Sequence, residues 1–256
     1  MGIGDDIMLT GEAKRLQQAD PRPVYIVRPD GRAYGRPEVF ENNPRITDKP
    51  EGAQRLVQGG GQRPYIVSKG LRRWVWKPYK PEPGEFYFTA EEESRGRAAR
   101  GTIVIEPSIK RSVGHQNKAW PWDRWLVLAA LLKRDYDVVQ LGDNTIRSIP
   151  GVRRIPTERF RIAAAALKHA AGLITTEGGL HHAAAAVGLP AVVIYTGFIG
   201  PQHTGYDMHV NLAKAKEYCG SRINCVHCAE AASRIAVDMV LGALIETQTL
   251  RQQEAA

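Results

Sequence analysis

The second half of the chain alternates short β-branched runs with helical stretches, and this alternation restricts the fold more than any other feature. Residues 102–107 (TIVIEP) are typical of a buried strand, and 122–134 (WDRWLVLAALLKR) carry apolar residues at helical spacing. The same patterns recur: strands are expected at 136–142, 173–176 and 190–197, and helices at 158–172 and 182–187. Repeated strand–helix–strand units form right-handed crossovers onto a parallel sheet. We therefore predict a parallel α/β domain in this half.

The first hundred residues show weaker patterns. We expect a helix over 6–19 and strands over 23–29 and 63–68, separated by turns rich in Gly, Pro and Asn. Residues 77–86 (KPYKPEPGEF) are expected to be extended because three prolines interrupt them. The N-terminal part is therefore predicted to be a second, smaller α/β unit.

A domain boundary is expected where charge and glycine mix, in 91–101 (EEESRGRAARG). The resulting domains are 1–98 and 99–256. Two α/β halves would form a cleft at the carboxyl ends of their strands, which is where open α/β folds bind ligands.

Composition sets broader limits. The chain has 256 residues, 43% of them hydrophobic and 24% charged, as in ordinary globular proteins. No apolar run approaches the ~18 residues needed to cross a bilayer, and MGIGDDIMLT carries aspartates where a signal peptide has cations. We expect a cytoplasmic protein, with peripheral contact at the inner face of the membrane as the alternative. The net charge of +8 favours an anionic partner, including nucleic acid, although a solvated basic surface explains it equally well.

The three cysteines lie close together in the sequence. Cys219, Cys225 and Cys228 are spaced C-x5-C-x2-C, and His227 stands beside the last. Three cysteines and a histidine can bind zinc. Adjacent His227 and Cys228 would have difficulty pointing at one ion, so we expect reduced, structural cysteines and no metal, with a metal site as the alternative.

The densest group of polar and glycine residues is the turn after the strand at 173–176. Glu177, Gly178 and Gly179 precede the helix that carries His181 and His182. Paired glycines let backbone amides approach a ligand, and a helix N-terminus attracts anions. This pattern predicts a diphosphate site, with His182 facing the ligand and His181 packed or solvated. The alternative is an ordinary strand-to-helix turn.

The stretch 172–197 (GLITTEGGLHHAAAAVGLPAVVIYTG) resembles the D-[ST]-G-x-x-H-x-A-A-A…P pattern of glycosyltransferase family 9, the ADP-heptose:lipopolysaccharide heptosyltransferases and their relatives. Other segments are similar to family landmarks and occur in the same order: GIGDDIMLTGEAKRL (2–16), NNPRI (42–46), NKAWPWDRW (117–125), VVQLG (138–142), GPQHTGY (200–206) and the cysteine-containing tail with its terminal helix (232–246).

The resemblance implies a GT-B fold, in which two Rossmann-like domains face a cleft, and inverting, metal-free transfer from a nucleotide-diphosphate sugar. Asp5 stands at the position of the family's catalytic base, and the adjacent Asp6 is the alternative candidate for this role. Both acids could instead cap the helix that begins there. Only three residues stand before the Gly4–Asp5 pair, so a reduced N-terminal domain is expected.

The donor-binding residues implied are Lys118, Glu177, Gly178, Gly179, His182, Thr204 and Gly205. A lysine is a flexible point charge suited to phosphate. The chain departs from the family where Glu177 and Gly178 replace Asp and Ser or Thr, which leaves the identity of the sugar open.

The acceptor-side candidates besides Asp6 are Arg72, Arg73, Trp74 and Trp76, from the stretch SKGLRRWVWKPYK. Cations interleaved with aromatics suit phosphorylated glycans, membrane surfaces or nucleic acid; a solvated strand edge is the alternative. The expected function is transfer of a sugar, heptose or another, to bacterial lipopolysaccharide or another surface glycan. The expected acceptor is a phosphorylated saccharide or a glycolipid. The nucleotide sugar is the substrate and no cofactor is expected. The alternatives are glycosylation of modified DNA and non-catalytic nucleotide-sugar binding.

Overall fold

The computed structural model describes residues 2–58, 63–107, 115–142 and 146–254. Its larger unit is a six-stranded sheet in the order β11-β10-β9-β6-β7-β8, with every neighbouring pair parallel. The strands are β6 (Ile103–Glu106), β7 (Val138–Leu141), β8 (Arg153–Ile155), β9 (Gly172–Thr176), β10 (Ala191–Tyr195) and β11 (Val210–Ala213). The helices of this unit are α2 (Ala90–Gly96), α3 (Trp122–Leu132), α4 (Phe160–His169), α5 (Gly179–Ala186), α6 (Pro201–Thr204), α7 (Val226–Ser233) and α8 (Val237–Glu254), with short 3-10 turns η2 (Arg97–Ala99) and η3 (His115–Lys118).

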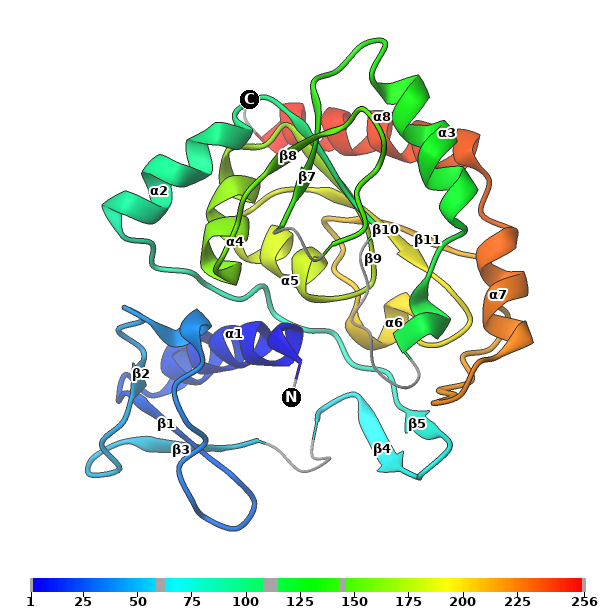
Figure 1. Cartoon of the computed structure of the whole chain (residues 1–256). Helices are drawn as coiled ribbons and strands as arrows, with labels where there is room; N and C mark the ends of the chain where they lie inside the picture. Colours follow the sequence, from blue (N-terminus) through cyan, green and yellow to red (C-terminus); the bar gives the residue numbers. More distant parts are fainter. Residues whose placement is uncertain (1, 59–62, 108–114, 143–145, 255–256) are drawn as a thin grey trace.

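Both faces of this sheet are buried. Alternate strand residues such as Ile105 and Ile194 pack against α3 and α8, and those between them, such as Val104 and Val193, pack against α4 and α5. Parallel sheets require such cover on both faces. Figure 1 shows α3 and α8 away from the N-terminal unit, whereas the segment that leads into α7 reaches the hairpin at β5 (Trp74–Trp76).

The N-terminal unit is small. Its parallel sheet has the order β2-β1-β3, and α1 packs beside it. An antiparallel hairpin, β4-β5, follows that sheet. The elements are α1 (Ile3–Ala19), β1 (Val24–Val27), η1 (Glu38–Phe40), β2 (Ile46–Thr47), β3 (Gln54–Val57), β4 (Ile66–Lys69) and β5 (Trp74–Trp76).

Helix α1 joins the two units. Its buried Ile7 and Leu9 share one apolar core with residues of α4 and α5. A Cβ added at Gly4 would lie 2.5 Å from His182 Cδ2, so the start of α1 rests directly on the His182 ring. The N-terminal acids are therefore held against the helix that follows the glycine turn.

Helix α2 is fixed to α4 by a buried ion pair. The fully buried Arg161 donates from Nε to Glu92 Oε1 at 2.6 Å and from Nη2 to Glu92 Oε2 at 2.7 Å. Thr89 caps α2 through the Glu92 amide. The domain boundary at 98/99 remains a prediction. Because α2 packs on α4, the extended stretch that ends at Thr89 is the better position for the boundary between the two units.

Most predicted elements are confirmed, namely the helices over α1, α3, α4 and α5 and the strands over β1, β6, β7, β9 and β10. The strand expected at 63–68 forms at Ile66–Lys69, in an antiparallel hairpin. Residues 91–101 are mainly helical, because the Thr89 cap and three glutamates at 91–93 favour a helix N-terminus. Strands β2, β3, β8 and β11 were not predicted.

Candidate active site between the two units

A cavity of about 650 Å³ lies between the two units. The N-terminal part contributes Asp5, Arg63, Tyr65, Lys69, Trp74 and Trp76, and the C-terminal part contributes residues that include Lys118, Glu177, Gly178, Gly179, His182 and Phe198. A separate hollow of about 790 Å³ between η3, α3 and α7 contains none of the predicted site residues. The predicted cleft is therefore present, and the glycine turn faces it.

The two glycines of the turn have different roles. A Cβ at Gly179 would lie 2.6 Å from Ile3 Cγ2, so this glycine allows α1 to pack on the turn. A Cβ at Gly178 would meet nothing nearer than 3.9 Å, and its φ of 167° is extended backbone that any residue adopts. The missing side chain at Gly178 therefore leaves space on the cavity side.

His181 organises the turn. The Gly178 N–H donates to His181 Nδ1 at 2.9 Å, and Nε2 of the same ring lies 3.0 Å from the Thr204 carbonyl. Burial lowers the pKa of His181, so its ring is neutral, with the proton on Nε2. Our expectation that the Gly178 amide binds phosphate is therefore wrong for this conformation, because that amide is occupied. The amides of the first turn of α5, from Gly179 onward, have no intrahelical acceptor.

Thr204 and Gly205 do not line the cavity. Thr204 lies behind His181, and Gly205 packs on Pro201, whose carbonyl would be 2.6 Å from an added Cβ. Thr204 accordingly acts on the turn through its backbone carbonyl, and Gly205 borders a different surface hollow.

His182 lines the cavity as an uncharged group. Its Nδ1 lies 2.8 Å from the Tyr206 hydroxyl. Burial, followed by the neighbouring His181, lowers the pKa of His182 well below its usual value. The His182 ring is therefore neutral and supplies no positive charge.

Lys118 and Glu177 form an ion pair inside the cavity. The Lys118 side chain is 16% exposed, and its Nζ lies 5.4 Å from the centre of the Phe198 ring. It is the cation next to the glycine turn, as predicted. Glu177 is one methylene longer than the Asp of the family pattern, and its carboxylate contacts Lys118 directly. An incoming anion must therefore share Lys118 with Glu177 or replace it.

Asp5 lies on the opposite wall and is held on both carboxylate oxygens. Arg63 Nη2 is 2.6 Å from Oδ2, and the Tyr65 hydroxyl donates to Oδ1 at 2.5 Å. Burial and then the Asp5 charge raise the pKa of Tyr65, which keeps the phenol protonated. Asp6 instead accepts a hydrogen bond from the Tyr34 hydroxyl at 2.5 Å and does not line the cavity. The structure therefore does not place Asp6, the alternative base, at the site.

The hairpin supplies an aromatic wall. Trp76 Nε1 donates to the Phe198 carbonyl at 2.8 Å, and Lys69 Nζ lies 4.9 Å from the centre of the Trp74 ring. Arg72 and Arg73 are exposed and do not line the cavity, contrary to our expectation. They occupy the connection between β4 and β5, whereas the half-buried Arg63 and the exposed Lys69 line the cavity.

Sequence reasoning missed Arg63 and left Lys69 out of the predicted site. For Lys69 a signal was available, since it belongs to the same stretch of cations and aromatics as Trp74 and Trp76. Nothing in the sequence placed Arg63, which precedes the hairpin, beside Asp5.

Glu177, His181 and His182 have ligand atoms within 4.8 Å of one another and could in principle hold a cation. However, both His181 nitrogens and Nδ1 of His182 already have partners. The arrangement therefore fits an anion beside Lys118 better than a metal at this point.

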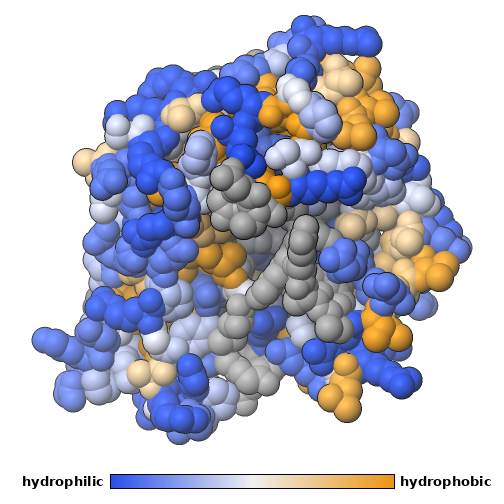
Figure 2. Space-filling view, in the orientation of Figure 1, coloured by the Kyte–Doolittle hydropathy of each residue, from blue (hydrophilic) through white to orange (hydrophobic). Residues whose placement is uncertain are grey.

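No helix in the described part of the chain has the length and apolarity needed to cross a membrane. The face shown in Figure 2 is mostly hydrophilic, with apolar residues in small groups.

Known proteins resemble this chain in fold and in sequence pattern. A family 9 glycosyl transferase from Veillonella parvula has 15% identity, covers 97% of this chain and 95% of its own, and gives a TM-score of 0.65, which confirms the GT-B-like α/β fold. ADP-heptose lps heptosyltransferase II of E. coli has 19% identity over 70% of this chain and 55% of its own, with a TM-score of 0.49. The iron-containing dodecameric glycosyltransferase TibC from enterotoxigenic E. coli has 18% identity over 68% and 51%, with a TM-score of 0.47.

The chain thus spans about half the length of these two E. coli enzymes. No curated protein matches it. The model of glycosyltransferase family 9 (heptosyltransferase) matches residues 78–236, which is more than half of the chain. This protein therefore belongs to glycosyltransferase family 9.

Proposed function

We propose that this protein transfers a sugar from a nucleotide-diphosphate donor to a saccharide acceptor, with inversion and without a metal at the reacting centre. One observation carries the proposal: the glycine turn, Lys118 and Asp5 line a single cavity between the two units. Membership of a glycosyltransferase family supports the reaction class. Inverting transfer needs a base on one side of the sugar and charge stabilisation of the leaving diphosphate on the other.

The diphosphate binds at the start of α5. The amides from Gly179 onward and the positive end of the helix dipole attract it, and Lys118 supplies a full charge. The absence of a side chain at Gly178 lets phosphate oxygens approach the turn. His181 keeps the turn in this shape, and the neutral His182 ring lines the cavity beside it.

Asp5 removes the proton of the acceptor hydroxyl. To do so it must release one of its contacts with Arg63, Tyr65 and the Gly2 amide. Release of the Tyr65 bond frees Oδ1 and costs less than release of Arg63, because Arg63 carries a full charge. Arg63 then keeps the carboxylate in place. The acceptor rests against Trp74 and Trp76, and Lys69 favours an anionic acceptor such as a phosphorylated saccharide or a glycolipid headgroup.

Non-catalytic binding of a nucleotide sugar is the second candidate function. It is favoured by the engagement of both Asp5 carboxylate oxygens in this conformation.

A donor-release assay separates the two functions. Sugar nucleotides that raise the melting temperature would first be found by thermal shift. The best one is then incubated with wild type, Asp5→Asn and the matched control Asp6→Asn. Transfer chemistry predicts slow nucleoside diphosphate release by wild type and Asp6→Asn, and about a hundredfold less by Asp5→Asn with the thermal shift retained. A bound donor that is never released supports the binding protein, and equal release by Asp5→Asn removes the base assignment.

A further inference from the structure

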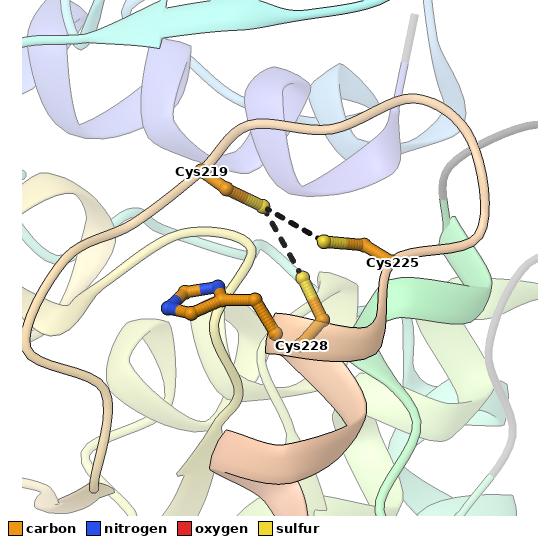
Figure 3. A group of neighbouring side chains, drawn as sticks. Cys219, Cys225 and Cys228 are labelled. Atoms are coloured by element: carbon orange, nitrogen blue, oxygen red, sulfur yellow. Dashed lines mark hydrogen bonds between the residues drawn. The ribbon is translucent and has the colours of Figure 1, made fainter.

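The three cysteines of the chain meet outside the cavity. Cys219 lies in the loop after β11, Cys225 precedes α7 and Cys228 is in its first turn. Figure 3 shows the three thiols pointing toward one another. Cys219 Sγ is 3.8 Å from Cys225 Sγ and 3.3 Å from Cys228 Sγ, and a ring nitrogen of His227 completes a set whose members all lie within 4.8 Å of one another. Adjacent His227 and Cys228 therefore do reach a common point, contrary to our expectation.

These separations suit a tetrahedral metal centre. With Zn–S bonds of ~2.3 Å, two sulfurs of a tetrahedron are ~3.8 Å apart. The first sulfur pair matches this separation, and the second needs to open by about half an ångström. Cys225 and Cys228 also have the C-x2-C spacing used by zinc sites, and they lie at a helix N-terminus, which favours thiolates.

We propose that Cys219, Cys225 and Cys228, with His227 as fourth ligand, bind one tetrahedral divalent metal ion, Zn²⁺ or Fe²⁺. Thiolate-rich sites with one imidazole select these soft or borderline ions. A closed set of four protein ligands leaves no open position, so the ion is structural. None of the four residues lines the cavity, which keeps this ion apart from the reacting centre.

The ion would stabilise one wall of the cavity. The Cys219 amide donates to the Gly197 carbonyl at 2.8 Å, and the Gly220 amide to the Phe198 carbonyl at 3.0 Å. The carbonyl of Gly220 in turn accepts from the Trp74 amide at 2.9 Å. Metal binding at Cys219 therefore fixes the loop that holds Phe198 and the hairpin together.

The loop that carries Cys219 also contacts the residue next to Lys118, the lysine proposed to bind phosphate. Asn117 donates to the carbonyls of Ser221 and Ile223 at 2.8 and 2.7 Å, and its Oδ1 accepts from the Cys225 amide at 3.0 Å. Asn117 immediately precedes Lys118. Loss of the ion should thus loosen the donor lysine and the aromatic wall together.

Metal analysis of the full chain tests the proposal, and it needs no substrate. The protein is purified without chelators, its bound metals are measured by inductively coupled plasma mass spectrometry, and Co²⁺ is then titrated into demetallated, reduced protein. We expect about one equivalent of Zn or Fe per chain, and with Co²⁺ a thiolate-to-metal charge-transfer band with intense tetrahedral d–d absorption.

Variants identify the ligands. Cys219→Ser, Cys225→Ser and Cys228→Ser should each lower Co²⁺ affinity at least about a hundredfold, and His227→Asn about tenfold. Val226→Ser, at an exposed position between two ligands, is the matched control and should bind as wild type does. Circular dichroism confirms that each variant is folded.

Three results would overturn the proposal: protein that neither retains metal nor develops the charge-transfer band, cysteine variants that bind Co²⁺ as wild type does, or a Cys219–Cys228 disulfide in freshly isolated protein. Unchanged affinity in His227→Asn would remove His227 from the ligand set.

Discussion

The two walls of the cavity are built in different ways. The wall proposed to bind the donor is built on a backbone turn, the glycine turn at the end of β9, in a sheet whose two faces are both buried; Lys118, Glu177 and His182 surround this turn. The acceptor wall is made of side chains from α1, Arg63, Tyr65 and the hairpin, joined by ionic, hydroxyl and aromatic contacts. Substitutions on the donor side should therefore act on folding or on nucleotide binding, whereas those on the acceptor side should act on chemistry with the fold intact.

The largest loss of stability is expected from disruption of the buried Glu92–Arg161 ion pair in the donor half. Glu92→Gln removes the closer counter-ion of the fully buried Arg161 and leaves only the 3.8 Å contact with Glu41, and we expect a loss of about 3 kcal/mol in the free energy of unfolding. The matched control in the N-terminal half is Asp20→Asn, which breaks the exposed pair with Arg22 and should have almost no effect. Urea unfolding of both variants measures the difference, and similar losses would contradict the contrast between the halves.

Acidic pH should lower the free energy of unfolding, because the donor half contains buried, neutral histidines. Burial lowers the pKa of His209 from 6.5 to about 4. Between these values the unfolded chain binds a proton that the folded protein excludes, so the free energy of unfolding falls as the pH drops from 6.5 to about 4. His209 alone contributes about 3 kcal/mol to this fall. His209→Asn should show a shallower pH dependence in denaturant titrations, and an unchanged slope would argue against this assignment.

Substitution of the two turn glycines should have smaller effects, but the two variants should differ in which property they change. Gly179→Ala places a methyl group against Ile3 and should cost about 1–3 kcal/mol of stability. Gly178→Ala meets no protein atom within 3.9 Å, so it should leave stability nearly unchanged while weakening donor binding about tenfold or more. Thermal unfolding and calorimetric titration of both variants make the comparison. The reverse pattern would mean that Gly178 does not face the ligand.

The smallest predicted effect concerns one charge. Lys118→Ala should weaken binding of a nucleoside diphosphate about tenfold and of the matching nucleoside very little, because only the diphosphate meets the lysine. Lys49→Ala, at an exposed site, is the control. Equal losses for both ligands would assign Lys118 a structural role only.

The centre of the donor half was predicted from the sequence, whereas its edge strands β8 and β11 and most of the small acceptor-side sheet were not, and the reason is physical. Strands such as β6 and β10 are buried on both faces, so they appear as continuous apolar runs, and Gly188 at φ +71° ends α5 as its position suggested. By contrast, the two-residue β2 and the half-exposed β3 carry no periodic signal. They form only because β1 offers a partner on each side.

The site shows the same division. Lys118 and His182 follow local motifs and line the cavity, as expected. The Arg63–Asp5 pair joins segments 58 residues apart in the sequence, and the occupation of the Gly178 amide by His181 depends on a side-chain rotamer. Neither contact can be deduced from spacing along the chain.

A crystal structure of the protein with the sugar nucleotide that stabilises it most tests the central claim directly. We expect diphosphate oxygens ~3 Å from the Gly179 amide and from Lys118 Nζ, with the sugar directed toward Asp5. A diphosphate bound in the hollow between α3 and α7, or a glycine turn that contacts no phosphate, would contradict it.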